Sequence, residues 1–150
     1  MKASKAGLLD LTNWQNCERD AKGVHMAREL SKVLVEVEAD VVTVTFALGE
    51  AIPGPVEWAS YGVDLFGPRG VGGKRFGVRF DADIASAYIF DWSSATQSNY
   101  EASFVEASES RIIVRFRDAS LGISSVATSR GWSSVNGRDV STHVPVVVLD

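Results

Sequence analysis

Few residues of this sequence combine a reactive type with a spacing that catalysis requires. Asp139 and His143 lie in a stretch that also contains serines, so the three residue types of a hydrolytic triad occur close together. A triad is defined by geometry, however, and no GxSxG, HExxH or CxxC pattern accompanies these residues. The other histidine, His25, lies near the start of the chain in no recognisable catalytic context. We therefore predict that the protein is not an enzyme.

A glycine-rich segment at positions 67–73 has the composition of a phosphate-binding loop but not its order. Such a loop needs a lysine followed by Ser or Thr, and a helix whose N-terminus faces the anion. Here Lys74 is followed by Arg75 and then by an alternating segment. We interpret the segment as a flexible hairpin loop, and the basic residues placed at its tip, Arg69, Lys74 and Arg75, are candidates for contact with a partner.

Two aspartates, Asp81 and Asp83, lie in one predicted turn, and Asp64 or Asp91 could lie nearby. Carboxylate oxygens at this density fit calcium, which prefers hard oxygen ligands. The spacing of an EF-hand is absent, and Asp favours turns for its own hydrogen bonds. The alternatives are thus a calcium site at Asp81 and Asp83 or two solvated turn residues, and we expect no other cofactor.

Aromatic residues outside the predicted core could bind sugars. Flat Trp and Tyr rings cover the apolar faces of a sugar while their polar tips stay in water. Trp58, Trp132 and Tyr100 fall at the ends of predicted strands or in loops, where such platforms are built. These three residues are candidates for carbohydrate or partner binding.

Several arginines are expected on the outward faces of strands: Arg79, Arg111, Arg115 and Arg117. Either these faces are solvated and the arginines pair with residues such as Glu36 and Glu109, or the arginines form a protein-binding patch.

The elements that must position these residues are strands. In the segment 32–48, Val33, Val35 and Val37 alternate with other residues, and a second arm from Val42 to Leu48 repeats the pattern. A period of two is typical of strands with one buried face, and the short polar stretch at 38–40 fits a tight antiparallel turn. This segment predicts a central β-hairpin.

Turn signals divide the rest of the chain into further short strands. We expect 93–99 to be a polar loop and 118–122 to be one helical turn that Asp118 caps. Tyr88, Phe90 and Trp92 share one face of their strand, and we interpret Trp92 as a core residue. Further strands are expected at 57–66, 74–80, 85–92, 100–105, 111–117, 123–128 and 144–149, with Pro145 at an edge or strand start.

The expected fold class is therefore all-β: a two-sheet antiparallel β-sandwich, jelly-roll-like or immunoglobulin-like, of about eight or nine strands. The length of 150 residues suits one domain. Residues 1–30 are polar and poor in β-branched types, so we expect them to form an N-terminal arm or docking segment before a sandwich at 31–150.

Composition excludes several classes of function. The net charge of −4 at pH 7 argues against general affinity for nucleic acid, which depends on an excess of Lys and Arg. Cys17 is the single cysteine, so no disulfide can form within the chain. Apolar runs are too short for a secretion signal or a membrane-spanning helix, and we expect no membrane partner.

A series of motifs resembles a known class of module. In order they are RDAKG at 19–23, LSKVLVEVEADVVTVTF at 30–46, IPGP at 52–55, YGVDLF at 61–66, AYIFDW at 87–92, SSATQSNY at 93–100, DASLG at 118–122 and GRDV at 137–140. The chain resembles β-sandwich modules of secreted proteins from high-GC Gram-positive bacteria, which are similar in architecture to carbohydrate-binding and DOMON-like sandwiches. The resemblance implies a fold more than a function.

Two functions remain open from the sequence. The first is a non-catalytic structural, assembly or display module, on a phage virion or another extracellular assembly, which could be a homo-oligomer with protein partners. The alternative is a carbohydrate-binding module that recognises a glycan through exposed aromatic residues. The absence of a secretion signal is compatible with a virion surface, and the resemblance favours ligand binding.

Overall fold

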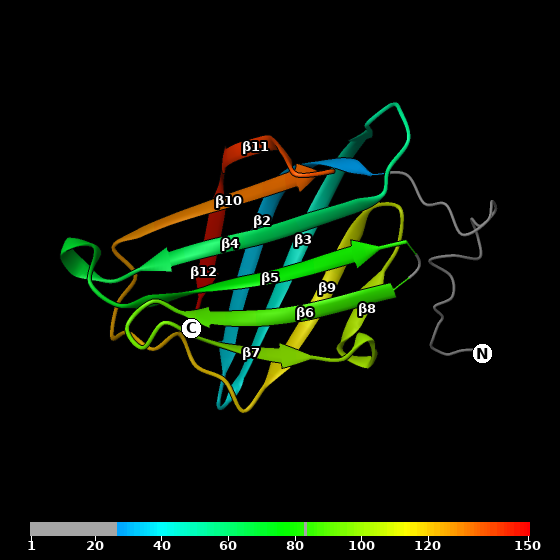
Figure 1. Ribbon diagram of the computed structural model, residues 1–150. Helices are drawn as coiled ribbons and strands as arrows, with labels where there is room; N and C mark the ends of the chain where they lie inside the picture. The colour runs from blue at the N-terminus through cyan, green and yellow to red at the C-terminus, as the bar shows by residue number, and fades with distance from the viewer. Residues whose placement is uncertain (1–26, 83) are drawn as a thin grey trace.

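The protein is a sandwich of two β-sheets packed face to face. The computed structural model describes residues 27–82 and 84–150. The six-stranded sheet has the order β11-β10-β4-β5-β6-β7, and the five-stranded sheet has the order β12-β2-β3-β9-β8 (Figure 1). The strands are β2 (Arg28–Glu38), β3 (Val41–Ala51), β4 (Trp58–Phe66), β5 (Gly73–Asp81), β6 (Ile84–Asp91), β7 (Thr96–Tyr100), β8 (Val105–Ala107), β9 (Arg111–Arg117), β10 (Thr128–Val135), β11 (Arg138–Val144) and β12 (Val146–Leu149).

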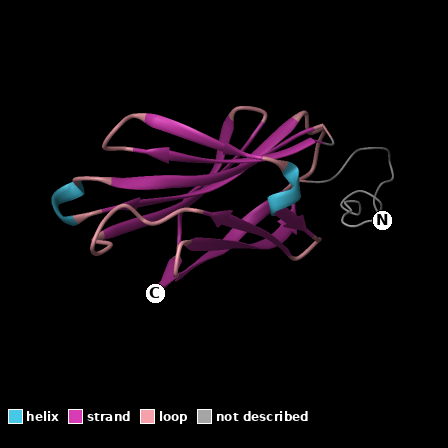
Figure 2. Cartoon of the chain, turned by 90° about the horizontal axis from the view of Figure 1, so that it is seen from below, coloured by secondary structure: helices cyan, strands magenta, loops and turns pink. Residues whose placement is uncertain are grey.

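The view from below in Figure 2 separates the two layers, with short 3-10 turns, η1 (Pro68–Gly70) and η2 (Ala102–Phe104), at the ends of strands. Neighbouring strands are antiparallel except β12, which lies parallel to β2 at the edge of the five-stranded sheet. Pro145 directly precedes this edge strand, as its missing N–H requires. The all-β sandwich expected from the sequence is confirmed, and the described residues contain more strands than the eight or nine expected.

The central hairpin forms where the alternating pattern predicts it. Val35 pairs with Val44 and Val37 with Val42 across β2 and β3, so the apolar side chains of both strands share one face. Two residues join the strands, and Ala39 takes a positive φ of 56°. Tight hairpin turns need this conformation because it matches the twist of the flanking strands. The hairpin then supplies the centre of the five-stranded sheet. Its first strand begins at Arg28, inside the expected arm, whereas residues 1–26 lie outside the described part.

The core lies between the sheets and is aromatic and aliphatic. Phe76 of β5 and Phe116 of β9 are fully buried, and their rings meet edge to face across the interface with centroids 5.3 Å apart. Such pairs contribute about 0.5–1.5 kcal/mol beyond the area they bury. Tyr61 reaches from β4 to the opposite sheet, where its hydroxyl donates to the carbonyl of Arg28 at 3.1 Å. Burial raises the pKa of Tyr61.

The last third of the chain differs from the expectation. Residues 118–122 contain no helical turn, and Asp118 has a φ of 54° in a tight turn. Residues 123–127 of the strand expected at 123–128 are irregular, and the sheet continues with the β10–β11 hairpin, which begins at Thr128. Asn136 and Gly137 form its turn with φ values of 51° and 84°. An Asn-Gly pair adopts this conformation at low cost and is a strong hairpin signal.

The polar segment at 93–99 was also predicted wrongly as a loop. Its second half forms β7, and a separate short strand, β8, replaces the strand expected at 100–105. All but one residue of β7 are exposed, so it has no apolar pattern to reveal it. Backbone pairing with β6 holds this edge strand, and polar side chains on an edge also discourage pairing with another molecule.

Candidate functional site

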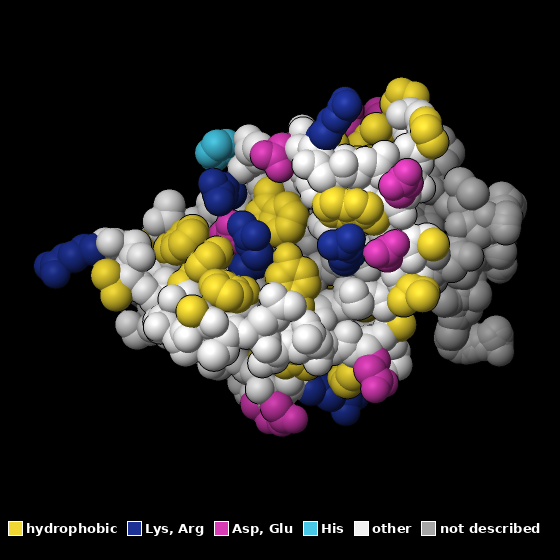
Figure 3. Space-filling model, viewed as in Figure 1, with side chains coloured by type: hydrophobic (Ala, Val, Ile, Leu, Met, Phe, Trp, Pro, Cys, Tyr) yellow, Lys and Arg dark blue, Asp and Glu magenta, His cyan; other side chains and the backbone are white. Residues whose placement is uncertain are grey.

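The outer face of the six-stranded sheet gathers most of the candidate residues. Side chains alternate along each strand, so the residues between the buried ones point to solvent. In Figure 3, hydrophobic side chains and basic side chains are interleaved at the centre of this face. We call it the aromatic–arginine face. Its members are Trp58, Ser60, Gly62 and Asp64 of β4, Arg75, Gly77 and Arg79 of β5, Tyr88 and Phe90 of β6, and Arg130, Trp132 and Ser134 of β10.

A row of four residues crosses the middle of this face. Trp132 pairs with Gly62, Gly62 with Gly77, and Gly77 with Tyr88, on four adjacent strands. A Cβ added at Gly62 would lie 2.8 Å from the indole nitrogen of Trp132, and one at Gly77 would lie 2.6 Å from the hydroxyl of Tyr88. Each ring therefore lies over a glycine, in space that any other side chain would fill. The two glycines let the two rings lie down on the sheet as a broad platform.

A buried carboxylate holds one end of this row in place. Asp64 is fully buried although it lies on the outer face of β4. Its Oδ1 accepts hydrogen bonds from Arg75 Nε at 2.7 Å and from Trp132 Nε1 at 3.1 Å. Its Oδ2 accepts from Arg75 Nη2 at 2.9 Å and from Arg130 Nη2 at 3.1 Å. A buried charge needs this degree of pairing, and the indole is oriented as a consequence.

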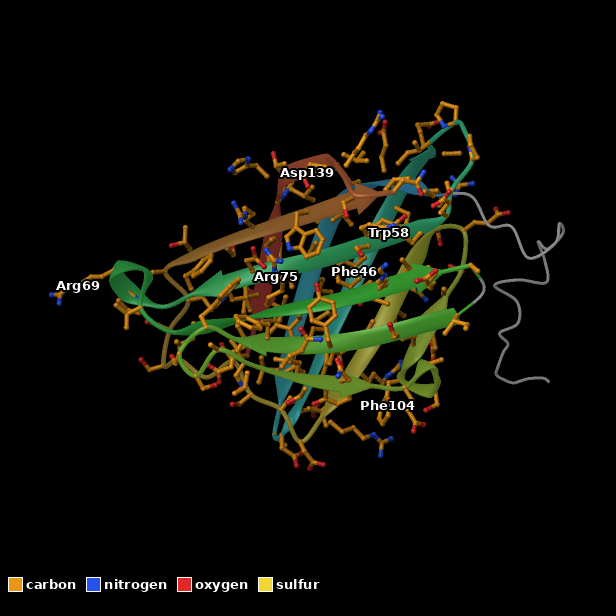
Figure 4. All side chains as sticks on the ribbon, in the orientation of Figure 1. Phe46, Trp58, Arg69, Arg75, Phe104 and Asp139 are labelled. Atoms are coloured by element: carbon orange, nitrogen blue, oxygen red, sulfur yellow. The ribbon has the colours of Figure 1, made fainter. Side chains whose placement is uncertain are left out.

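Arg75 connects the carboxylate to the aromatic rings. Its two-pronged hydrogen bond with Asp64 raises the pKa of the guanidinium, against the opposing effect of partial burial. The same guanidinium lies 4.6 Å from the ring centroid of Trp132 and 5.4 Å from that of Trp92. Cation–π contacts at this range are worth about 0.5–2 kcal/mol, depending on desolvation. Arg75 is thus a positioning residue at the centre of the face, and the prediction that placed it at a loop tip is wrong (Figure 4).

A second arginine–tryptophan pair lies farther along the same strands. Arg79 stacks on Trp58 with its guanidinium carbon 4.1 Å from the ring centroid. The backbone N–H of Trp58 donates to the side chain of Asn136, in the β10–β11 turn, at 3.2 Å. Arg79 also forms an ion pair with Asp81 at 3.5 Å, which is long and exposed. An exposed ion pair of this length contributes little to stability, so the stack on Trp58 determines where the Arg79 side chain lies.

Two shallow hollows flank the arginines on this face. The first, of about 390 Å³, has Trp58 and Trp132 in its lining and extends to Asp139 of β11 (Figure 4). The second, of about 450 Å³, lies toward β6 and β7 and includes Tyr88 and Asn99. Ser60, Arg75 and Arg79 line both hollows. Together they make one surface wide enough for more than one small ring-shaped ligand unit.

The interpretation of Trp92 as a core residue is wrong. The residues of β6 that face the interior are Ala87 and Ile89, whereas Tyr88 and Phe90 lie on the outer face. Trp92 follows on that face, with Phe90 at a ring distance of 5.0 Å, Phe66 at 5.5 Å and Arg75 nearby. Phe76 of the neighbouring strand β5 and Phe116 of the other sheet already occupy the interior beside β6, so this strand turns Ala87 and Ile89 inward and its larger rings outward.

The other candidates fall into two groups. Trp58 and Trp132 are brought together with Arg75 on the aromatic–arginine face. Tyr100 lies away from it: its ring packs on Phe116 at 5.1 Å, and its hydroxyl donates to the carbonyl of Arg117. Arg69 is at the tip of η1, remote from the face (Figure 4). Tyr100 is thus a packing residue, and Arg69 makes no site with the others.

The described part of the structure does not gather a set of calcium ligands at the predicted site. Asp81 is exposed and pairs with Arg79, while Asp83 lies outside the described residues. Asp64 is directed at two arginines, and Asp91 accepts hydrogen bonds from the backbone of the following turn. Within residues 27–82 and 84–150, no three His, Cys, Asp or Glu side chains gather around a common point. Calcium binding stays a prediction.

The histidines and the outward arginines lie elsewhere. His143 is exposed at the end of β11, where its Nδ1 lies 3.1 Å from the hydroxyl of Thr142, and His25 is outside the described part. Arg115 pairs with Glu106 at 2.9 Å, across two strands of the five-stranded sheet, rather than with the glutamates expected. Among the described residues, no helix has the length and apolar character needed to cross a membrane.

Comparison of the chain with protein-family models, with curated proteins and with solved structures found no match.

Several residues of the face were not singled out for a site, among them Tyr88, Arg130, Gly62 and Gly77. The sequence holds one signal for them, since glycines at 62 and 77 interrupt strands that otherwise alternate well. A glycine inside a strand often marks a close approach by another group. Here that group is an aromatic ring, and the result is an open surface with apolar rings, fixed guanidinium groups and several hydroxyls.

Proposed function

We propose that the protein is a non-catalytic carbohydrate-binding module whose ligand lies on the aromatic–arginine face. The supporting observation is the row in which Trp132 and Tyr88 lie flat over Gly62 and Gly77. Sugars offer apolar C–H faces ringed by hydroxyl groups, so a broad aromatic surface bordered by polar side chains matches both parts.

The surroundings of the rings support the same ligand. Ser60, Ser134 and Thr142 provide hydroxyls, and Asn99 provides an amide, around the two hollows. The Asp64 network holds Trp132 before a ligand arrives, so little side-chain entropy is lost on binding. The two hollows share Ser60, Arg75 and Arg79 and therefore adjoin, which suits a chain-like ligand such as a polysaccharide.

The proposal is tested by binding measurements on the folded chain. A glycan array identifies ligands, and isothermal titration with the best of them gives the affinity of wild type, Trp132→Ala and Trp58→Ala. We expect each variant to weaken binding about tenfold or more, as for central aromatic residues of an interface. Phe104→Ala is the matched control, because it removes a ring that lies at η2, away from the face.

The control should bind like wild type, and circular dichroism should report the same strand content for every variant. Two results would contradict the proposal. One is an array and a set of polysaccharide titrations without any ligand. The other is a ligand whose affinity Trp132→Ala and Trp58→Ala leave unchanged.

The second candidate is a structural or assembly role, and it involves the opposite face of the sandwich. Val147 pairs with Leu34, Leu34 with Thr45 and Thr45 with Ile113, so a partly apolar stripe crosses the outside of the five-stranded sheet. Val147 and Leu149 of the edge strand β12 are 43% and 52% exposed. Apolar side chains gathered at an edge are compatible with contact to another copy or to a virion protein.

Light scattering coupled to size-exclusion chromatography tests this second role. If the stripe is an interface between copies, the protein elutes as an oligomer and Val147→Glu converts it into a monomer. Ile84→Glu is the control, since Ile84 is an exposed apolar residue on the other sheet. A wild-type monomer at all accessible concentrations would remove self-assembly from consideration.

A further inference from the structure

The aromatic–arginine face gathers arginines on a chain that is acidic as a whole. Three arginines line its two hollows: Arg75, Arg79 and Arg130. Opposing carboxylates on the described part of the face are the buried Asp64, Asp81 in its long ion pair with Arg79, and Asp139 in the lining of the first hollow. The whole chain carries a net charge of −4. A cationic concentration of this kind, set among aromatic rings, attracts an anionic ligand.

The three arginines differ in how much of their binding capacity the protein uses. Arg75 donates two hydrogen bonds to Asp64 and is held between rings. Arg130 donates one hydrogen bond to Asp64 through Nη2, its Nε is buried, and the remainder of its guanidinium group is partly exposed. Arg79 has a ring beneath it and an ion pair at 3.5 Å. Arg79 and Arg130 therefore retain donors for a ligand.

Both of these arginines line the first hollow, together with Trp58 and Trp132. The side chains of Arg79 and Arg130 are each 43% exposed, so their guanidinium groups reach solvent there. A guanidinium matches a carboxylate or sulfate through two parallel hydrogen bonds, and it is held more rigidly when stacked on a ring. The hollow thus combines a surface for the apolar face of a sugar with a receptor for an acidic substituent.

We infer that the glycan bound by this face is acidic, with a carboxylate-bearing or sulfated sugar seated in the first hollow between Arg79 and Arg130. This inference rests on the proposed carbohydrate-binding function and narrows its ligand. Asp139 at the rim of the first hollow accepts hydrogen bonds from sugar hydroxyls. Its own negative charge repels acidic groups of the ligand, so the carboxylate or sulfate must lie on the arginine side of the hollow.

The experiment compares ligands that differ only in charge. Polygalacturonate and its fully methyl-esterified form share one backbone, and dextran sulfate and dextran form a second such pair. Titrations of the full chain at low and high salt give the affinities. We expect the acidic member of at least one pair to bind about 10- to 100-fold more tightly than its neutral partner, which is the range for a hydrogen-bonded charge. We also expect that preference to decrease with added salt.

Arg79→Gln and Arg130→Gln separate the site from general charge attraction. Each should remove most of the preference for the acidic ligand, because it lowers the affinity for the acidic member of a pair much more than the affinity for the neutral member. Arg115→Gln is the matched control, because it deletes the same charge on the opposite sheet, where Arg115 pairs with the exposed Glu106. The control should retain the full preference.

The outcomes separate this inference from the proposed function. Equal binding of acidic and neutral ligands, or a neutral glycan as the best ligand of the array, would overturn the acidic specificity while glycan binding stands. A preference that Arg115→Gln reduces as much as Arg79→Gln does would also overturn it. No binding to any glycan or polysaccharide would overturn both.

Discussion

The substitution Gly62→Ala is a direct test of how the aromatic–arginine face is built. The new methyl carbon would lie 2.8 Å from Nε1 of Trp132 and closer still to two carbons of the indole. Carbon atoms pack at about 3.5–4.0 Å, so the ring must move by roughly 1 Å or more. That movement stretches the hydrogen bond from Nε1 to Asp64, now 3.1 Å, and separates the ring from Arg75.

The expected loss of stability follows from these two effects. Forcing a methyl group into a packed site costs about 1–3 kcal/mol, and weakening a hydrogen bond to a buried carboxylate costs about 1 kcal/mol or more. We expect Gly62→Ala to lower the free energy of unfolding by about 2–4 kcal/mol, which for a domain of this size lowers Tm by roughly 5–15 °C. Urea unfolding followed by circular dichroism measures the first quantity, and calorimetry measures the second.

A double-mutant cycle identifies the cause. In a Trp132→Ala background the ring is absent, so Gly62→Ala should be neutral or slightly stabilising, because alanine suits a strand interior better than glycine. Gly49→Ala is the control, since a Cβ at this strand position meets its nearest atom at an ordinary 3.7 Å. A cost for Gly62→Ala below about 0.5 kcal/mol, or the same cost with and without the indole, would refute the reasoning.

Three further predictions concern ionisable groups. Asp64→Asn should destabilise the fold by about 2–4 kcal/mol in urea unfolding, because it leaves two arginines without their carboxylate, whereas the exposed Asp81→Asn should change nothing measurable. Burial raises the pKa of Tyr61, so the unfolded chain loses this proton first and stability should fall as the pH rises above about 10; Tyr61→Phe should flatten this decline in a Tm series. Calcium should give no heat in titration and no rise in Tm, since Asp81 pairs with Arg79 and no three described His, Cys, Asp or Glu side chains gather at one point; a clear rise would restore the calcium site.

Alternation in the sequence predicted the strands that bury one face. Val42, Val44 and Phe46 of β3 and Ile112, Val114 and Phe116 of β9 point inward as their spacing indicates. The pattern is informative there because a shift by one residue would expose the whole apolar set. The strand β7 gave no such signal, since its side chains are nearly all in water. The β10–β11 hairpin was missed although Asn136 and Gly137 mark its turn.

The candidate site was predictable in part. Trp58 and Trp132 were candidates for sugar binding from residue type, and both lie on the aromatic–arginine face. Tyr100 has the same chemistry, but its ring packs against Phe116, away from the aromatic–arginine face. Residue type defines what a side chain can bind, whereas its neighbours determine whether the side chain is accessible.

The sequence by itself determined that the chain alternates between two faces and therefore forms a β-sandwich. Only the tertiary structure decided which face of β6 is buried, because a period of two is unchanged when inside and outside are exchanged. It also decided that β10 lies beside β4, which brings Arg130 and Trp132 to a carboxylate 66 and 68 residues away in the chain. That pairing depends on how all the strands pack together, and no local pattern encodes it.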